Sequence, residues 1–191
     1  MAEGRNRWQL AQVNIAMLRA PLDSPQLARF VAGLEPINRL ADQSPGFVWR
    51  LQTQEGDATA LRPFDDERVM INLSVWESPE ALWDFVYATR HLDLLRRRRE
   101  FFTRPAGAYL ALWWVPAGYV PTVEEAKDRL RLLGSRGPSP DAFTFRERFP
   151  APAAENTGQV SGIGGIAWSP WAARKLPRGT DGPALHATPD T

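Results

Sequence analysis

The chain has 191 residues, 43% of them hydrophobic and 24% charged, and this balance is typical of one folded domain with a normal core. The net charge of +1 gives no reason to expect binding to nucleic acid or to an anionic membrane. The lack of cysteine excludes disulfides, thiolate metal sites and cysteine nucleophiles.

Neither a membrane segment nor an export signal is predicted. Every apolar run is shorter than the roughly 20 residues that cross a bilayer. The N-terminal stretch MAEGRNRWQL also lacks the apolar segment of a signal peptide. We therefore expect a soluble cytoplasmic protein.

The chain begins with a predicted strand and helix. Residues 8–18 alternate between a small or aliphatic face and a face that carries Gln12 and Asn14. Residues 24–43 follow helical spacing, with Ser24 as the cap. Pro36 lies inside that stretch, and we expect it to kink or split the helix.

A second strand is predicted over residues 47–52. Phe47 and Trp49 lie on one face of it, and Val48 and Arg50 on the other. Residues 54–67 are polar and form a loop that is long enough to cover a site.

The unit that follows organises the fold. Residues 69–76 alternate strictly, so one face is aliphatic and the other carries Asn72, Ser74 and Trp76. Ser78 is a suitable N-cap, and Pro79 fits the first helical position. The helix should end near His91, and we expect this unit to border the functional site.

The rest of the chain adds a helix over 90–102, a strand over 108–115 and a helix that ends near Gly134. Thr122 and Glu125 form a capping box at the start of that last helix. Residues 142–149 form a short extended segment. Residues 1–150 are thus expected to be the folded domain, and residues 151–191 an irregular tail.

This order of elements indicates an α+β fold of the ferredoxin-like type. We expect a four-stranded antiparallel sheet with helices on one face. The other face would carry polar and aromatic side chains: Gln12, Asn14, Asn72, Ser74, Trp76 and one of Trp113 or Trp114. Two chains could close these faces into a barrel, which predicts a homodimer with a hydrogen-bonding aromatic cavity. The inward face of the second strand depends on its register.

Several motifs in this order resemble the DUF3291 family. They are LAQVNIAMLRAPLDSP, SPGFVWRLQ, NLSVWESPEAL followed by FVYATRH, and YLALWWVPAG followed by PTVEEA. That family is similar to the dimeric α/β-barrel group that contains the antibiotic-biosynthesis monooxygenases. The resemblance covers residues 8–150 and implies the fold more firmly than it implies an activity.

The resemblance also proposes Asn14, Trp76 and His91 as pocket residues, by likeness to haem-degrading relatives. His91 would act as a general base or as an axial haem ligand. Its alternative role is a helix-end histidine that bonds a carbonyl or Asp93. No cofactor is required by the sequence, haem is an alternative, and no metal site is predicted.

The remaining candidates would position a substrate. Asn14 and Asn72 can orient a carbonyl or stabilise an oxyanion, and their alternative is ordinary polarity of a sheet face. Arg50 can clamp a carboxylate. Five further side chains would line the cavity or, for the aromatic ones, form core or interface: Gln12, Ser74, Trp76, Trp49 and Trp113.

The resulting hypothesis is a small-molecule enzyme that resembles cofactor-independent monooxygenases and acts on an aromatic or polyketide-like substrate. In this hypothesis His91 is the base, Asn14 and Asn72 orient the substrate, and Trp76 is a wall of the cavity. Three alternatives stay open: a non-catalytic ligand-binding or dimerisation module, an isomerase or cyclase with the same base, and a haem-using enzyme.

Overall fold

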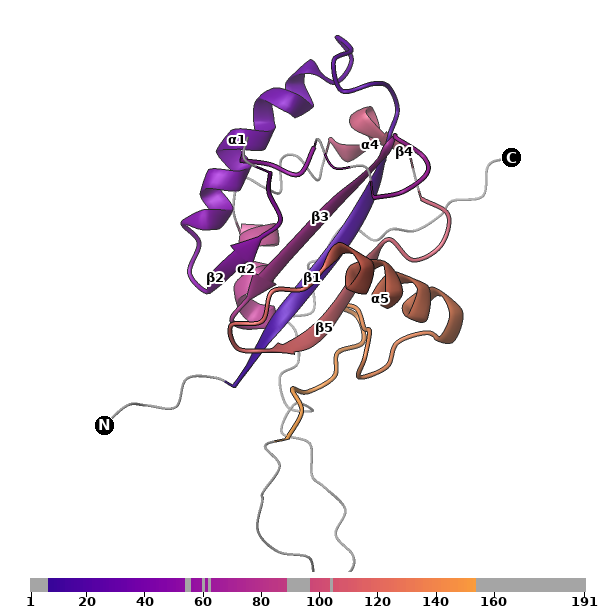
Figure 1. Cartoon of the computed structure of the whole chain (residues 1–191). Coiled ribbons are helices and arrows are strands. Elements are labelled where there is room, and N and C mark those ends of the chain that lie inside the picture. The colour runs from indigo at the N-terminus through magenta and orange to yellow at the C-terminus, as the bar shows by residue number, and fades with distance from the viewer. Residues whose placement is uncertain are drawn as a thin grey trace, which may run out of the picture. The chain divides into compact units, whose positions relative to one another are not determined.

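The computed structural model describes residues 7–53, 56–59, 61, 63–88, 97–103 and 105–153. Within them one antiparallel sheet contains β1 (Trp8–Leu18), β2 (Phe47–Arg50), β3 (Val69–Trp76), β4 (Phe102–Thr103) and β5 (Leu110–Pro116). The helices are α1 (Ala28–Asp42), α2 (Pro79–Ala88), α4 (Arg98–Phe101) and α5 (Val123–Arg136) (Figure 1). The predicted tail lies, from residue 154 onward, outside the described residues.

Strand β1 is the centre of the sheet. It pairs with β3 on one side, and on the other side with β5 and, at its last two residues, with β4. Strand β2 pairs with the outer side of β3, so the order is β2-β3-β1-β5 and every pairing is antiparallel. This is the strand order of a ferredoxin-like fold, and the predicted α+β class is confirmed.

Two of the predicted helix caps are confirmed. Ser78 Oγ accepts a hydrogen bond from the backbone N–H of Ala81 at 3.1 Å, and Thr122 Oγ1 accepts one from the N–H of Glu125 at 3.1 Å. Each bond satisfies an N–H group that has no partner within its own helix.

The structure contradicts the predicted cap of the first helix and shows that Pro36 does not split it; a kink at Pro36 stays a prediction. Ser24 belongs to a turn, in which its N–H bonds to the carbonyl of Pro21, and α1 begins only at Ala28 after the N-cap Leu27. Pro36 neither splits α1 nor ends it, because the helix continues to Asp42.

The aliphatic face of the sheet is covered by α5. Ala126, Leu130 and Leu133 follow each other at helical spacing and pack on the buried aliphatic residues of β1, β3 and β5. Phe64, from the connection between β2 and β3, packs on the same face. In Figure 1, α5 lies in front of the sheet and α2 lies behind it.

The opposite, mixed face is covered by helices of the same chain. Leu10 and Trp76 cluster with Leu82 and Phe85 of α2 and with Ala41 of α1. Helices therefore lie on both faces of the sheet, which corrects the prediction that they share one face. The reason is that each face has apolar positions that need cover, and the chain has enough amphipathic helices to supply it.

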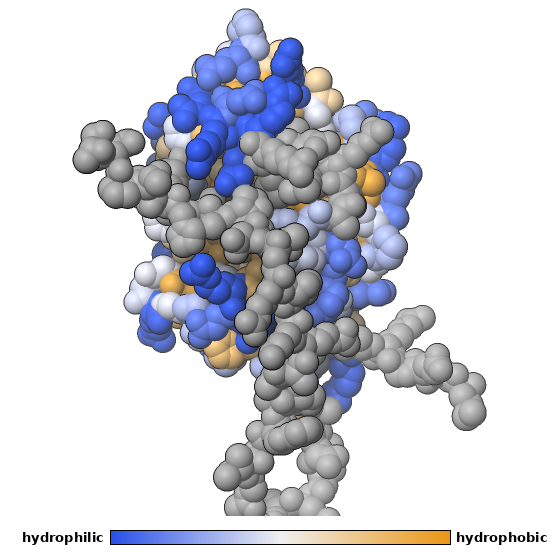
Figure 2. Space-filling model, turned by 180° about the vertical axis from the view of Figure 1, so that it is seen from behind, coloured by the Kyte–Doolittle hydropathy of each residue, from blue (hydrophilic) through white to orange (hydrophobic). Residues whose placement is uncertain are grey.

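This arrangement removes the reason for expecting a dimer through the mixed face. That prediction required the face to be bare until a second chain covered it, whereas α1 and α2 pack there. Figure 2 shows the molecule from behind, where hydrophilic residues make up most of the visible described surface and smaller hydrophobic patches lie between them.

A bulge in β2 sets which of its side chains meet each face. Phe47 pairs with Trp76, but the register shifts between Phe47 and Trp49. Phe47 therefore packs on the mixed face and Trp49 on the aliphatic face. Strict alternation had placed both on one face, and the extra residue makes that prediction wrong.

Two segments near the sheet differ from expectation or refine it. The predicted helix over 90–102 is described only from residue 97, and in that part α4 ends at Phe101 and β4 follows. The predicted extended segment 142–149 pairs with β5 at one bridge, between Leu112 and Phe143. No helix among the described residues has both the length and the apolar character needed to span a bilayer.

Candidate functional site

Four polar side chains form a band across the middle of the mixed sheet face. This polar band consists of Gln12 and Asn14 on β1 and of Asn72 and Ser74 on β3. Gln12 lies directly opposite Ser74, and Asn14 directly opposite Asn72. Gln12 and Ser74 are each 5% exposed, Asn14 is half-buried and Asn72 is exposed. The band therefore runs from a buried end to an end at the surface.

A chain of hydrogen bonds connects most of the band. The indole Nε1 of Trp76 donates to Ser74 Oγ at 3.0 Å. Ser74 Oγ donates to Gln12 Oε1 at 2.9 Å, and Gln12 Nε2 donates to Asn14 Oδ1 at 2.8 Å. Sequence alternation placed these four residues on one face, and the structure brings them into contact.

An aromatic cluster stands at the buried end of the band. The rings of Trp76 and Phe85 are stacked with centroids 5.1 Å apart, and Phe47 meets Trp76 edge-on at 5.3 Å. Trp76 is 1% exposed, so its indole is part of the core and does not face solvent.

A second aromatic cluster stands at the other end. Phe30 of α1 contacts Phe101 and Phe102 with centroids 5.8 and 5.0 Å apart, and Met70 of β3 packs against this group. Helix α1 contributes to both clusters and so follows the band along one side. Polar groups between apolar walls are the usual composition of a small-molecule site.

Arg50 shares the band's face because it lies opposite Ser74. Its guanidinium binds the Asp42 carboxylate through two bonds of 2.8 and 3.1 Å, and it also donates to the carbonyl of Gly56 at 2.7 Å. This bidentate pair ties the end of α1 to the sheet. Nothing in the sequence indicated Asp42 as the partner.

Trp49 and Trp113 are not brought to the polar band. Both pack on the aliphatic face, where Trp113 Nε1 donates to Glu125 Oε1 at 2.9 Å. Trp114 shares the face of the band, since it alternates with Trp113, and its Nε1 donates to the carbonyl of Phe149 at 2.9 Å. The register of β5 against β1 separates the two tryptophans, and that register is visible only in the structure.

Tyr87, near the end of α2, is a titratable group on this side of the sheet. Burial raises the pKa of its hydroxyl, the nearby Tyr109 raises it further, and the positive charge of Arg98 opposes both effects. The hydroxyl is thus protonated at neutral pH and can donate a proton or a hydrogen bond.

His91, the predicted base, lies outside the described residues, and so does His186. Among the residues that the structure does describe, no group of three or more histidine, aspartate or glutamate side chains has the geometry of a metal site.

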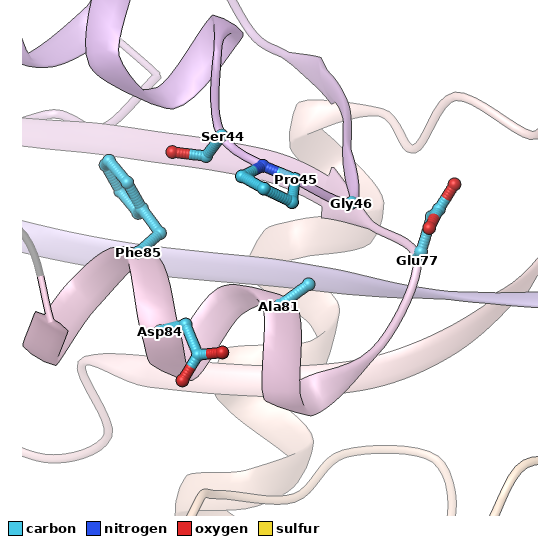
Figure 3. A pocket seen from close by; sticks show the side chains of 7 residues that line it. All are labelled: Ser44, Pro45, Gly46, Glu77, Ala81, Asp84 and Phe85. Carbon is cyan, nitrogen blue, oxygen red and sulfur yellow. The ribbon is translucent and has the colours of Figure 1, made fainter.

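A cavity of about 360 Å³ opens beside the first aromatic cluster. Figure 3 shows Ala81 and Phe85 of α2 directed toward the turn at residues 44–46, with Asp84 on the same helix and Glu77 at one end. None of the four polar-band residues lines this cavity, so it is a neighbour of the band and not its interior.

Several solved structures are similar to this chain in fold but differ greatly from it in sequence. A variant of SnoaB from Streptomyces nogalater, a cofactor-independent oxygenase, is 17% identical with a TM-score of 0.39, and the match covers 59% of this chain and 95% of SnoaB. PA3566 from Pseudomonas aeruginosa is 13% identical with a TM-score of 0.40, over 61% of this chain and 100% of that protein. A protein of unknown function from Nitrosomonas europaea is 14% identical with a TM-score of 0.37, over 61% and 98%.

None of the curated proteins matches the sequence. One family model does match, and it covers residues 9–159, which include every described strand and helix from β2 to α5 and nearly all of β1. Its description is a domain of unknown function. On this match, the chain belongs to the DUF3291 family.

Proposed function

We propose that this protein is a small-molecule enzyme that binds an aromatic substrate with an ionisable oxygen at the polar band. The observation that carries the proposal is the hydrogen-bonded chain from Trp76 to Asn14, which lies between two aromatic clusters. Its proposed chemistry is that of a cofactor-independent monooxygenase.

The proposed role of the band is to stabilise a substrate anion. Asn14 and Asn72 are opposite each other on neighbouring strands, where Cβ atoms are about 4.5–5.5 Å apart, so both amides can reach one ligand oxygen. Amide N–H groups that are already in place stabilise a developing oxyanion more strongly than water does. An electron-rich substrate anion could then pass an electron to oxygen without a metal.

His91 is the proposed base. In the sequence it stands between α2, which packs at the buried end of the band, and α4, which packs at the other end. An unperturbed histidine titrates near neutrality and can accept the substrate proton. The proposal does not need haem, and the haem-using alternative predicts a Soret band in the purified protein.

The proposed partner is therefore a small molecule. Homodimerisation stays a prediction from the family resemblance, and native mass spectrometry tests it. Since α1 and α2 occupy the mixed face, a dimer would have to use another surface.

The test combines binding with oxygen uptake. A panel of flat phenols is titrated against the purified protein, and any phenol that binds is then assayed in an oxygen electrode. Asn14→Ala should reduce turnover by about 10- to 100-fold if its amide supports the oxyanion. Gln9→Ala is a matched control, because Gln9 lies on β1 outside the band and bonds the N–H of Gly118.

Each result has a distinct meaning. Oxygen uptake that depends on Asn14 supports the monooxygenase. Binding without oxygen uptake favours the binding module or an isomerase on the same site. If Asn14→Ala and Gln9→Ala bind phenols equally well, the polar band is not the site.

A further inference from the structure

The direction of every hydrogen bond in the polar band follows from one side chain. An indole nitrogen can only donate, so Ser74 Oγ must accept from Trp76. Ser74 is 5% exposed, and its own proton must then find an acceptor. Within the described part of the chain the acceptor that it contacts is Gln12 Oε1, at 2.9 Å.

The opposite polarity would leave a buried proton without a partner. If Gln12 were turned round, its Nε2 would donate to Ser74, and the serine proton would face a group that cannot accept it. An unpaired polar group in a buried place is unfavourable, so this arrangement is disfavoured. Gln12 must therefore present Oε1 to Ser74 and direct Nε2 toward Asn14.

The same reasoning fixes Asn14. Because Gln12 Nε2 donates at 2.8 Å, the atom of Asn14 that receives it is Oδ1. The amide NH₂ of Asn14 then lies on the remaining side of the group. That side lies at the outer end of the band, where Asn14 is half-buried and the opposite residue, Asn72, is exposed.

We infer that Trp76, through Ser74 and Gln12, holds Asn14 with its NH₂ toward the ligand, so that the site selects a hydrogen-bond acceptor such as a phenolate or enolate oxygen. Trp76, Ser74 and Gln12 are positioning residues in this inference, and Trp76 does not serve as a wall that touches the substrate. The inference rests on the proposed function, because it assumes that a ligand binds at the band.

The site does not need a positive charge to prefer the anion. Arg50, which lies opposite Ser74 on this face, is engaged by the carboxylate of Asp42. A set of neutral donors with a fixed orientation favours the ionised form of a phenol, because the charged oxygen accepts stronger hydrogen bonds than the neutral one.

The test uses 4-nitrophenol, whose colour reports whether its hydroxyl is ionised, at a pH equal to the pKa of the free probe. The bound probe should be mainly phenolate in the unmodified protein. Trp76→Phe keeps an aromatic ring against Phe85 but removes the N–H, and should weaken phenolate binding by about three- to tenfold. Gln12→Glu supplies only acceptors, should turn the Asn14 amide round, and should shift the bound probe to the neutral phenol.

Trp114→Phe is the matched control. Trp114 lies on the same face, and its substitution also removes one indole N–H. That N–H, however, donates to the carbonyl of Phe149 and not to a residue of the band. It should leave the ionisation of the bound probe unchanged. Ser74→Ala is a second way of cutting the chain if Trp76→Phe does not fold, as judged by circular dichroism.

The outcomes separate the two claims. If the folded, unmodified protein binds no 4-nitrophenol or related phenol, the proposed function is overturned. If the probe binds but its ionisation is the same in the unmodified protein, Ser74→Ala and Gln12→Glu, the band has no fixed polarity and the inference is wrong. A shift in these variants, with none in Trp114→Phe, supports it.

Discussion

Replacing Gly46 by alanine should separate α2 from the turn at residues 44–46. Gly46 has φ +77°, and a Cβ atom built there would lie 2.6 Å from the Cβ of Ala81. Alanine in the left-handed region costs about 1–2 kcal/mol. The contact adds about 1–3 kcal/mol, because Ala81 Cβ is attached directly to the helix backbone and cannot rotate away.

Gly118→Ala isolates the contact from the backbone effect. Gly118 has φ +83°, but no heavy atom beyond its two chain neighbours lies within 4 Å of the place that a Cβ would occupy. Both variants share the strain of a positive φ and the reduced freedom of the unfolded chain. Their difference in unfolding free energy should therefore report the contact alone, about 1–3 kcal/mol.

The measurement is urea denaturation followed by far-ultraviolet circular dichroism. The double variant Gly46→Ala/Ala81→Gly completes a cycle, in which removing the Ala81 methyl should recover most of the contact cost. The single variant Ala81→Gly corrects for the loss of about 1 kcal/mol that glycine causes inside a helix. If Gly46→Ala loses no more stability than Gly118→Ala, the close packing of this turn against α2 is not real.

Three further predictions concern the rest of the described structure. Glu125→Ala should cost about 1–3 kcal/mol in urea denaturation, since it leaves the buried N–H of Trp113 without an acceptor, whereas Glu125→Gln keeps an acceptor and should lose less. Thr122→Ala should cost about 1 kcal/mol in the same assay because it removes the cap of α5, and Thr122→Ser should be nearly neutral. The side chain and backbone N–H of Arg68 lower the pKa of Asp66 to about 2, so its stabilising effect is present above the ordinary pKa of 3.8 and is lost as the pH falls through about 2. An NMR titration should find this low value and a return toward 3.8 in Arg68→Ala; no change in that variant would refute the assignment.

The sequence predicted the polar band because period-two alternation is a local property. Gln12 and Asn14 had to share a face, as did Asn72 and Ser74, whatever the rest of the fold did. That Gln12 meets Ser74 and Asn14 meets Asn72 depends on the register between β1 and β3, which only the structure shows.

What covers each face could not be predicted in this way. The amphipathic pattern of α5 shows that it buries one side, but it does not say which face of the sheet receives it. The bulge between Phe47 and Trp49 is equally hidden, since an extra residue in a strand leaves no composition signal here. The partner of Arg50 is Asp42 at the end of α1, on the other side of the turn that leads into β2, and no periodic pattern indicates this pair.

The two outer strands bear on how readily the edges of the sheet could pair with another chain. Within the described residues β2 pairs only with β3, is four residues long and contains the bulge, so it offers a poor template for an incoming strand. On the other side of the sheet, the backbones of Phe143 and Leu112 exchange two hydrogen bonds, so Phe143 occupies part of the outer edge of β5. Deleting Val48 would remove the bulge, so the hydrogen bonds between β2 and β3 would form a longer regular ladder. The expected consequence is a greater tendency to form intermolecular β-structure at high protein concentration.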